Sequence, residues 1–183
     1  MRSELERIYS TTPPHECDVI SELIEGLPLD AIMVEIGTGG GRVTALLAYA
    51  CVGTQRMVYT IDSSEEKNRY RWNRGPREVI KGLGLTPYVR FIEAKSQEVW
   101  KDFDGQIDFL FIDGSHQYRD VLADIVNWYP LIKKGGIISG HDFDPNCPDG
   151  RQVIKAIFDS NVFGVFSGFS VKHRIFWKVK NEA

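Results

Sequence analysis

The sequence predicts an α/β fold in which a doubly wound, mostly parallel sheet of seven strands is covered by helices. Apolar, strand-like runs alternate with segments of helical spacing along the chain, as in repeated β-α units. The first of these runs leads into a glycine-rich turn and then a helix, an arrangement typical of ligand-binding α/β sheets. Two β-rich runs around Ser167-Gly168 indicate an antiparallel C-terminal hairpin.

Each expected element follows from a local pattern of apolar residues and breakers. The seven strand-like runs are Ala31–Ile36, Met57–Ile61, Tyr88–Glu93, Ile107–Ile112, Ile137–Gly140, Val162–Phe166 and Val171–Val179. The expected helices are Cys17–Leu27, Arg42–Cys51, Glu65–Trp72, Glu78–Gly82, Gln97–Trp100, Tyr118–Ile132 and Gly150–Ser160. The pair Gly135-Gly136 is expected to end the long segment before the fifth strand. We expect a single domain over residues 1–183, in which residues 1–29 form an N-terminal arm and helix.

The turn after the first strand predicts a nucleotide-like cofactor. It lies within the run Met33–Thr44, where glycines allow the backbone to turn sharply and approach a ligand closely. The helix that begins near Val43 would direct free N–H groups at that ligand. Glu35 is the one acidic residue in an otherwise apolar strand, so it needs a partner, which a ligand amine or backbone donors would supply.

The spacing of the turn argues against a dinucleotide. The dinucleotide pattern places a third glycine where this chain has Arg42. The next strand ends in Asp62, about 20 residues past the turn, where a carboxylate can accept both ribose hydroxyls. Asp62 is also suited to cap a helix, a role that Ser63 and Ser64 could fill as well, and both roles can hold at once.

Composition excludes several classes of protein. The chain has 183 residues, 43% of them hydrophobic, and a net charge of −3 without a basic cluster, so we expect no nucleic-acid partner. Its three widely spaced cysteines indicate reduced thiols rather than a disulfide framework. The charged N-terminus is no signal peptide, and the apolar runs are too short to span a bilayer. We therefore expect a cytoplasmic protein with no membrane partner.

Titratable residues gather after the later strands. Asp113 and His116 follow the fourth strand, His141 and Asp142 follow the fifth, and Ser96-Gln97 follow the third. Since the carboxyl ends of parallel strands share one edge of the sheet, these groups should lie close to the cofactor turn. Any one of them alone would more often cap a helix or satisfy loop amides. Together they predict a functional site.

Two motifs resemble known methyltransferases. The pattern E-x-G-x-G-x-G from Glu35 to Gly41 resembles the first motif of class I S-adenosylmethionine-dependent methyltransferases. The run Asp108–Phe143 is similar to bacterial small O-methyltransferases and, more distantly, to metal-dependent catechol O-methyltransferases. The likeness covers most of the chain, from Asp30 to about Ser160, and implies a Rossmann-like fold. It implies S-adenosylmethionine bound by Glu35, Gly37, Thr38, Gly39, Asp62, Ser63, Ser96, Gln97 and Asp113.

The same resemblance implies a metal and a base. The catechol enzymes hold magnesium with an aspartate after strand four and an Asp-Asn pair after strand five, which match Asp113 and His141-Asp142. Histidine in place of an oxygen ligand suits Mn, Fe or Zn better than Mg. Their general base matches His116, for which a structural hydrogen bond is the rival role. For His141 the rival roles are base and simple loop residue, so Asp113 and Asp142 are the better metal candidates.

These observations predict a methyltransferase that uses S-adenosylmethionine, with metal-assisted O-methylation of a small-molecule hydroxyl. The alternatives are a non-catalytic S-adenosylmethionine-binding subunit and, less favoured, an NAD-dependent oxidoreductase. Tyr9 and Phe143 could line a pocket for a planar or sugar-like acceptor. We expect a homodimer built through the arm or the hairpin, because Val171–Val179 would be an apolar edge strand. The alternative is that this strand lies between two others.

Overall fold

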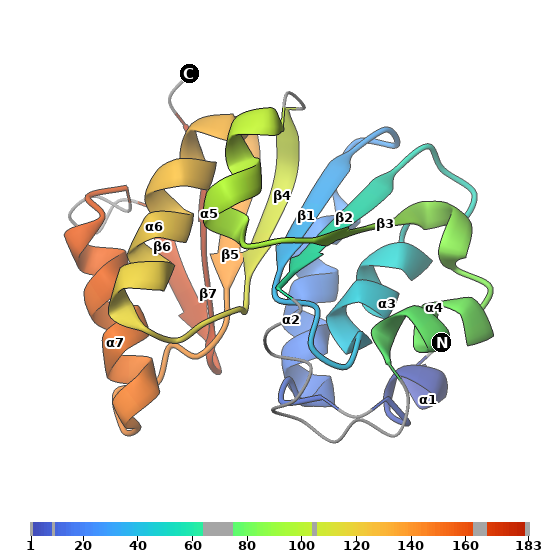
Figure 1. Cartoon of the computed structure of the whole chain (residues 1–183), viewed down its shortest axis with the longest axis horizontal. Helices are drawn as coiled ribbons and strands as arrows, with labels where there is room; N and C mark the ends of the chain where they lie inside the picture. The colour runs from blue at the N-terminus through green and yellow to red at the C-terminus, as the bar shows by residue number, and fades with distance from the viewer. Residues whose placement is uncertain (1, 9, 64–74, 104–105, 163–167, 182–183) are drawn as a thin grey trace.

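The computed structural model describes residues 2–8, 10–63, 75–103, 106–162 and 168–181, and these form the predicted α/β sheet (Figure 1). Seven strands lie in the order β3-β2-β1-β4-β5-β7-β6. β7 is antiparallel to both of its neighbours, and the other pairs are parallel. The strands are β1 Ile32–Ile36, β2 Met57–Asp62, β3 Val89–Glu93, β4 Ile107–Ile112, β5 Ile132–Gly140, β6 Phe169–Lys172 and β7 Ile175–Val179. The predicted doubly wound sheet with an antiparallel C-terminal hairpin is confirmed.

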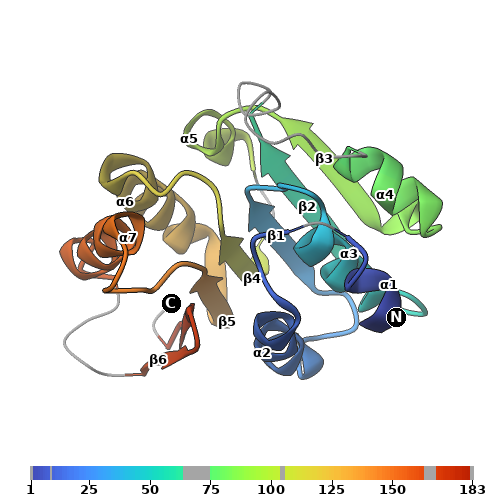
Figure 2. The ribbon, with the colours of Figure 1, turned by 90° about the horizontal axis from the view of Figure 1, so that it is seen from below.

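Helices cover both faces of the sheet (Figures 1 and 2). One group comprises α1 Arg2–Leu5, α2 Pro14–Glu25, α3 Arg42–Tyr49 and α4 Pro76–Gly82. The other comprises α5 Ser96–Val99, α6 Tyr118–Trp128 and α7 Pro148–Asp159. Successive strand residues point to opposite faces, so Met33 joins the first apolar core and Val34 the second. Both faces are buried, which explains why the central strands are almost continuously apolar.

The strand register brings the predicted site residues to one edge. Ile36 at the end of β1 pairs with Ile61 of β2 and with Ile112 of β4. Ile112 in turn pairs with Gly140 at the end of β5. The carboxyl ends of four neighbouring strands are therefore aligned. Asp62 is the last residue of β2, and Gly37, Asp113 and His141 directly follow β1, β4 and β5.

The pair Gly135-Gly136 lies inside a strand, contrary to the prediction that it ends a helical segment before one. α6 ends at Trp128, a 3-10 helix follows over Tyr129–Leu131, and β5 begins at Ile132. Gly135 has a positive φ of 83°, and the β4–β5 register shifts between Ile107 and Phe109. A Cβ on Gly136 would lie 2.9 Å from the carbonyl oxygen of Ile107. The glycines thus permit an irregular, close strand pairing.

The C-terminal run predicted as one edge strand, Val171–Val179, is two strands. The chain reverses at His173, whose φ is 57°, and β7 then lies between β5 and β6. β7 is paired along both of its edges, so the edge-strand argument for a dimer was wrong. The edge strand at this end of the sheet is β6, which has four residues and is short enough to limit pairing with other chains.

Helix starts differ from the predictions for one shared reason. The helices expected from Cys17, Glu78 and Gly150 begin earlier, each with proline in its first turn: Pro14, Pro76 and Pro148. Proline suits that position because its missing N–H would be unpaired there anyway. The predicted helix Glu65–Trp72 and most of the run Val162–Phe166 lie outside the described residues. Cys17, Cys51 and Cys147 are free thiols, and no helix in the described ranges could cross a membrane.

Candidate active site

The glycine turn between β1 and α3 is held by strand-end contacts. Gly37, Gly39 and Gly41 have positive φ values of 92°, 49° and 87°. A Cβ on Gly37 would lie 2.2 Å from the carbonyl oxygen of Asp113, so only glycine fits there. The Asp62 carboxylate accepts hydrogen bonds from the N–H groups of Thr38 at 2.8 Å and Gly39 at 3.2 Å. The end of β2 therefore fixes the turn.

Glu35 is buried beneath this turn. Its Oε2 accepts a hydrogen bond from the Thr44 hydroxyl at 2.6 Å, so the expected partner is first of all a side chain of α3. Burial raises the pKa of Glu35 to about 8, against the opposing effect of hydroxyls from Thr44 and Thr60. The carboxyl group lines a cavity, where an ammonium group would favour its charged form.

Two cavities open at this edge of the sheet and share Gly37, Asp62, Gly114 and Ser115. The first has a volume of about 490 Å³ and the second about 420 Å³. Of the predicted cofactor residues, the first is lined by Gly37, Asp62, Ser63, Ser96 and Gln97. The second is lined by Glu35, Gly37, Thr38, Gly39, Asp62 and Asp113, together with His116. All nine predicted cofactor residues therefore line one continuous region.

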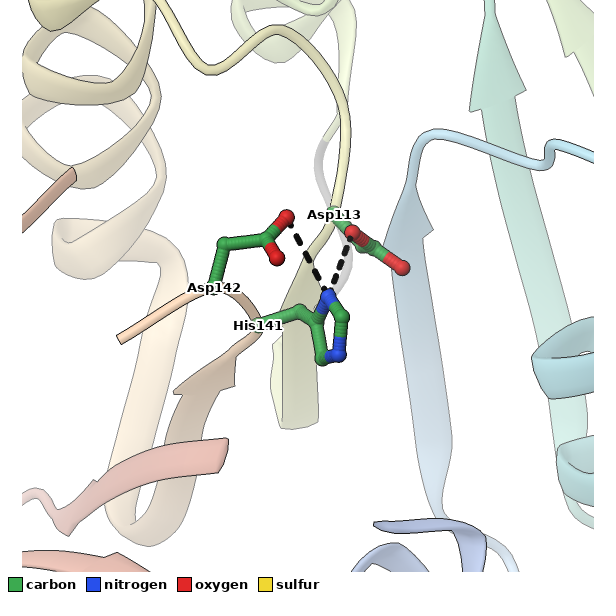
Figure 3. A group of neighbouring side chains, drawn as sticks. All are labelled: Asp113, His141 and Asp142. Atoms are coloured by element: carbon green, nitrogen blue, oxygen red, sulfur yellow. Dashed lines mark ion pairs between the residues drawn. The ribbon is translucent and has the colours of Figure 1, made fainter. Parts of the chain in front are cut away.

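The predicted metal residues come together as well (Figure 3). His141 Nδ1 lies 3.4 Å from Asp113 Oδ1 and 3.2 Å from Asp142 Oδ2. One donor atom from each residue falls within 4.8 Å of the other two, a spacing that a metal ion could bridge. Neither contact has hydrogen-bond geometry, and buried Nδ1 has no hydrogen-bond partner in the described part of the chain. Asp142 has a φ of 61°, which is rare outside glycine and marks a constrained position.

Two residues that the sequence analysis missed complete this cluster. Glu16 of α2 accepts a 2.7 Å hydrogen bond from Nε2 of His141 and is only 1% exposed. Arg174, in the β6–β7 turn, pairs with Glu16 at 2.9 Å and with Asp142 at 3.1 Å. Burial alone would raise the pKa of Glu16, but its bonds with His141 and Arg174 lower it. No sequence signal links these residues, because Glu16 lies 125 positions from His141 and 158 from Arg174.

His116 faces the second cavity and contacts the same cluster. Its Nε2 lies 2.9 Å from Asp142 Oδ2, and its Nδ1 lies 3.9 Å from the exposed carboxylate of Asp149. The bond to Asp142 raises the pKa of His116. Burial would raise the pKa of Asp142, but the two histidines hold it well below its usual range. With Nε2 engaged, Nδ1 is the atom of His116 that can exchange a proton with a bound molecule.

The N-terminal arm forms one wall of the second cavity. Ser10, Thr11 and Thr12 line it, and the Thr12 hydroxyl donates to Asp113 Oδ2 at 3.2 Å. Arg42, at the position where a dinucleotide site has glycine, is buried and donates to the arm's carbonyl oxygens, at 3.0 Å for Leu5 and 2.6 Å for Thr12. The residue that breaks the dinucleotide pattern therefore joins the cofactor turn to this wall.

Of the two aromatic residues proposed for an acceptor pocket, the structure describes only Phe143, and it lies elsewhere. Tyr9 lies outside the described residues. Phe143 packs against Phe169, with ring centroids 5.6 Å apart, and belongs to the apolar core around α6 and α7. The described lining of the second cavity is mostly polar.

Comparison with known families gives a direct match. A family model described as a methyltransferase domain matches residues 34–143, more than half of the chain. That span contains the glycine turn, Asp62, the Asp113–His116 loop and the His141-Asp142 pair.

Solved structures share the fold at low sequence identity. An O-methyltransferase from Bacillus cereus in complex with SAH is 19% identical, with a TM-score of 0.71, and the match covers 97% of this chain and 91% of that one. The O-methyltransferase NovP is 16% identical, with a TM-score of 0.69, and the match covers 93% of this chain and 81% of that one. The MycE methyltransferase of the mycinamycin pathway, in complex with Mg and SAH, is 15% identical, with a TM-score of 0.63, and the match covers 98% of this chain and 54% of that one.

Two curated relatives match short segments. An uncharacterized protein of Sinorhizobium fredii (strain NBRC 101917 / NGR234) is 37% identical over 59 residues, which are 30% of this chain and 6% of that protein. An uncharacterized protein of Acanthamoeba polyphaga mimivirus is 49% identical over 37 residues, 20% of this chain and 17% of that protein. The matches therefore span less than a fifth of either relative.

Proposed function

The chain belongs to the family of S-adenosylmethionine-dependent methyltransferase domains, and we propose that it methylates a hydroxyl group of a small molecule with the help of a divalent cation. The observation that carries the proposal is buried His141 Nδ1, which faces Asp113 and Asp142 without a hydrogen bond. Once Nδ1 has lost its proton, this nitrogen and the two carboxylates form a donor set that suits Mn²⁺, Fe²⁺ or Zn²⁺ better than Mg²⁺.

The charges around this donor set fit a divalent cation. Arg174 pairs with both Glu16 and Asp142. Its single positive charge offsets one of the three carboxylates Glu16, Asp113 and Asp142, so two negative charges remain. Burial would lower the pKa of His141, but the surrounding carboxylates raise it to about 12, so His141 is protonated when no cation is bound. A cation would take the place of the Nδ1 proton. Glu16 keeps a proton on Nε2, and this orients the Nδ1 lone pair toward Asp113 and Asp142.

The proposed chemistry divides between the two cavities. S-adenosylmethionine would supply an electrophilic methyl group, and this group would lie where the two cavities meet. Glu35 would pair with the ammonium group of the cofactor, and Asp62 would accept from its ribose hydroxyls. The cation would lower the pKa of the acceptor hydroxyl. His116 would take the proton at Nδ1, and the arm wall with Thr12 would hold the acceptor in line with the methyl group.

A methyl-transfer assay with the purified chain tests the reaction. Transfer from S-adenosylmethionine to a panel of phenols, sugars and carboxylates should stop in excess chelator and return with added Mn²⁺. His116→Gln should lower kcat on the order of 10²-fold or more, whereas the exposed control His15→Gln should not. Full activity in excess chelator would remove the cation from the mechanism, and protonated His141 would then be the group that neutralises the two aspartates.

Calorimetry with S-adenosylhomocysteine tests the cofactor residues separately from catalysis. Asp62→Ala should weaken binding by one or two charged hydrogen bonds, about 1.5–3 kcal/mol each. It also removes the acceptor for Thr38 and Gly39, so both effects act in the same direction. Unchanged affinity would exclude Asp62 from the cofactor site.

We also propose that the chain forms a homodimer, a proposal that now rests on exposed apolar groups near the hairpin. Val171, Val179 and Phe158 are 40%, 40% and 50% exposed. Light scattering at micromolar concentration should give the mass of two chains, and the mass of one chain would refute the proposal.

A further inference from the structure

The floor of the first cavity contains a buried aspartate with no part in the chemistry above. Asp124 of α6 is 2% exposed and lines this cavity. Its Oδ1 atom accepts two hydrogen bonds, from the hydroxyl of Ser96 at 2.6 Å and from the amide nitrogen of Gln97 at 2.8 Å. Burial raises the pKa of Asp124 to about 7. A buried carboxyl group is costly, so its bonds should serve a purpose at this position.

Asp124 determines which polar atoms Ser96 and Gln97 can offer to a ligand. The oxygen Oδ1 accepts both bonds whether the carboxyl group is ionised or carries a proton on its other oxygen. The only hydrogen on the Ser96 hydroxyl is therefore used, and the Gln97 amide directs its NH₂ group toward Asp124. What remains for a ligand is the hydroxyl oxygen of Ser96, the carbonyl oxygen of Gln97 and the second N–H of the Gln97 amide, and the two oxygens are acceptors.

The short helix α5, which contains Ser96 and Gln97, is also fixed by a second contact. The indole Nε1 of Trp128 donates to the carbonyl oxygen of Ser96 at 3.3 Å. Asp124 and Trp128 lie one turn apart on α6, so α6 holds both the backbone and the side chains at the start of α5. The acceptors are therefore held in place before a ligand binds.

We propose that Asp124 is a positioning residue that makes the first cavity select a 6-amino purine over a 6-oxo purine. A 6-amino group donates hydrogen bonds and meets the fixed acceptors, whereas a 6-oxo group would place an oxygen against them. The inference rests on the proposed function in one respect, namely that this cavity holds the nucleoside part of the cofactor. It adds that base selection depends on a residue that acts through Ser96 and Gln97.

Calorimetry with two probes tests the inference without an activity assay. The probes are S-adenosylhomocysteine and its deaminated analogue S-inosylhomocysteine, which differ at the 6 position of the purine. The natural chain should bind the adenosyl probe at least about tenfold more tightly, as expected for the loss of one hydrogen bond and an unpaired acceptor. Asp124→Leu frees the Gln97 amide to rotate, so the ratio of affinities should fall below about threefold. A merely structural defect would weaken both probes equally and leave the ratio unchanged.

Three further variants make the result decisive. Asp124→Asn keeps an oxygen acceptor and should restore the preference. Asp159→Leu is the matched control, because Asp159 also accepts from a hydroxyl, that of Tyr118 at 2.8 Å, but lies outside both cavities. It should keep the natural ratio. If Asp124→Leu does not fold, Gln97→Leu tests the same route, since Asp124 acts through Gln97.

The outcomes distinguish the role of Asp124 from the assignment of the cofactor to the first cavity. A natural ratio in Asp124→Leu or in Gln97→Leu overturns the inference alone, and so does equal binding of both probes by the natural chain. Binding of neither probe by the natural chain overturns the proposed cofactor cavity, and the inference with it. A reduced ratio in Asp124→Leu, with the Asp159→Leu ratio unchanged, supports both.

Discussion

Strand β4 has an aspartate near each end, and the two are treated differently. Asp108, near its amino end, is 2% exposed and has both carboxylate oxygens paired within the protein. One accepts from the backbone N–H of Ile32 at 2.8 Å, and the other pairs with Lys133 at 2.5 Å. Both oxygens of this buried carboxylate therefore have partners within the protein, so Asp108 has a structural role.

Asp113, which follows the carboxyl end, is left partly unsatisfied. Thr12 donates to one of its oxygens, while the other faces His141 Nδ1 at 3.4 Å without a hydrogen bond. The aspartate at the amino end of the strand thus has both oxygens paired within the protein, whereas the aspartate that follows the carboxyl end has one oxygen that could bind a ligand. The contrast teaches that a functional carboxylate is recognised by what its neighbours leave unpaired rather than by its burial.

The largest effect is expected where the carboxyl ends of β1 and β4 meet. Gly37→Ala would place a Cβ 2.2 Å from the Asp113 carbonyl oxygen at a φ of 92°, so the turn and the Asp113 loop must both move. S-adenosylhomocysteine binding should fall by 100-fold or more, about 3 kcal/mol. The control is Gly53→Ala, which has a φ of 77° and open space around its Cβ position. Calorimetry showing equal affinity in the two variants would contradict the assigned contact.

Glu35 extends the comparison to a buried carboxyl group that has no cationic side chain among its interacting neighbours in the described part of the chain. Its folded pKa of about 8 lies above the ordinary value of 4.5, so the folded chain binds this proton more tightly than the unfolded chain does. The resulting stability is fully present below pH 4.5 and is lost as the pH rises through 8. The loss should be on the order of a few kcal/mol.

Urea unfolding between pH 5 and 8.5 measures this loss. Glu35→Gln cannot titrate and can still accept from Thr44, so its free energy of unfolding should vary less with pH than that of the natural chain. Other titrating groups are common to both chains and cancel in the difference. Parallel pH curves would show that Glu35 is ionised in the folded protein.

The smallest effect is expected at the amino end of β4. Asp108→Asn keeps one acceptor for the Ile32 N–H but loses the charge opposite Lys133, so the free energy of unfolding should fall by about 1.5 kcal/mol. Binding of S-adenosylhomocysteine and Mn²⁺ should stay as in the natural chain. A change in either affinity would mean that the two ends of the strand are not independent.

Local patterns in the sequence were sufficient to predict the fold and to place the candidate site residues at one edge of the sheet. The strand ending in Glu35-Ile36 and the glycines after it predicted the turn between β1 and α3. The prediction that Asp113 and His141 lie close together needed only that the fourth and fifth strands be neighbours, which the β4–β5 register confirms.

The unpredicted parts depend on contacts between distant segments. Glu16 and Arg174 reach the cluster because α2 packs near β7, and nothing local to either residue indicates that contact. Gly135-Gly136 was misread because a glycine pair can end a helix or permit an irregular strand, and only the pairing with β4 decides between them. Asp124 was overlooked because its helical spacing differs little from that of an ordinary polar position.

Mn²⁺ titration tests the central claim most directly, with binding followed by electron paramagnetic resonance in the presence of saturating S-adenosylhomocysteine. The natural chain should bind one Mn²⁺ per chain, Asp113→Asn should lose that binding, and Asp108→Asn should keep it. Failure of the natural chain to bind Mn²⁺ at millimolar concentration, or equal binding by Asp113→Asn, would contradict a cation site at the carboxyl ends of β4 and β5.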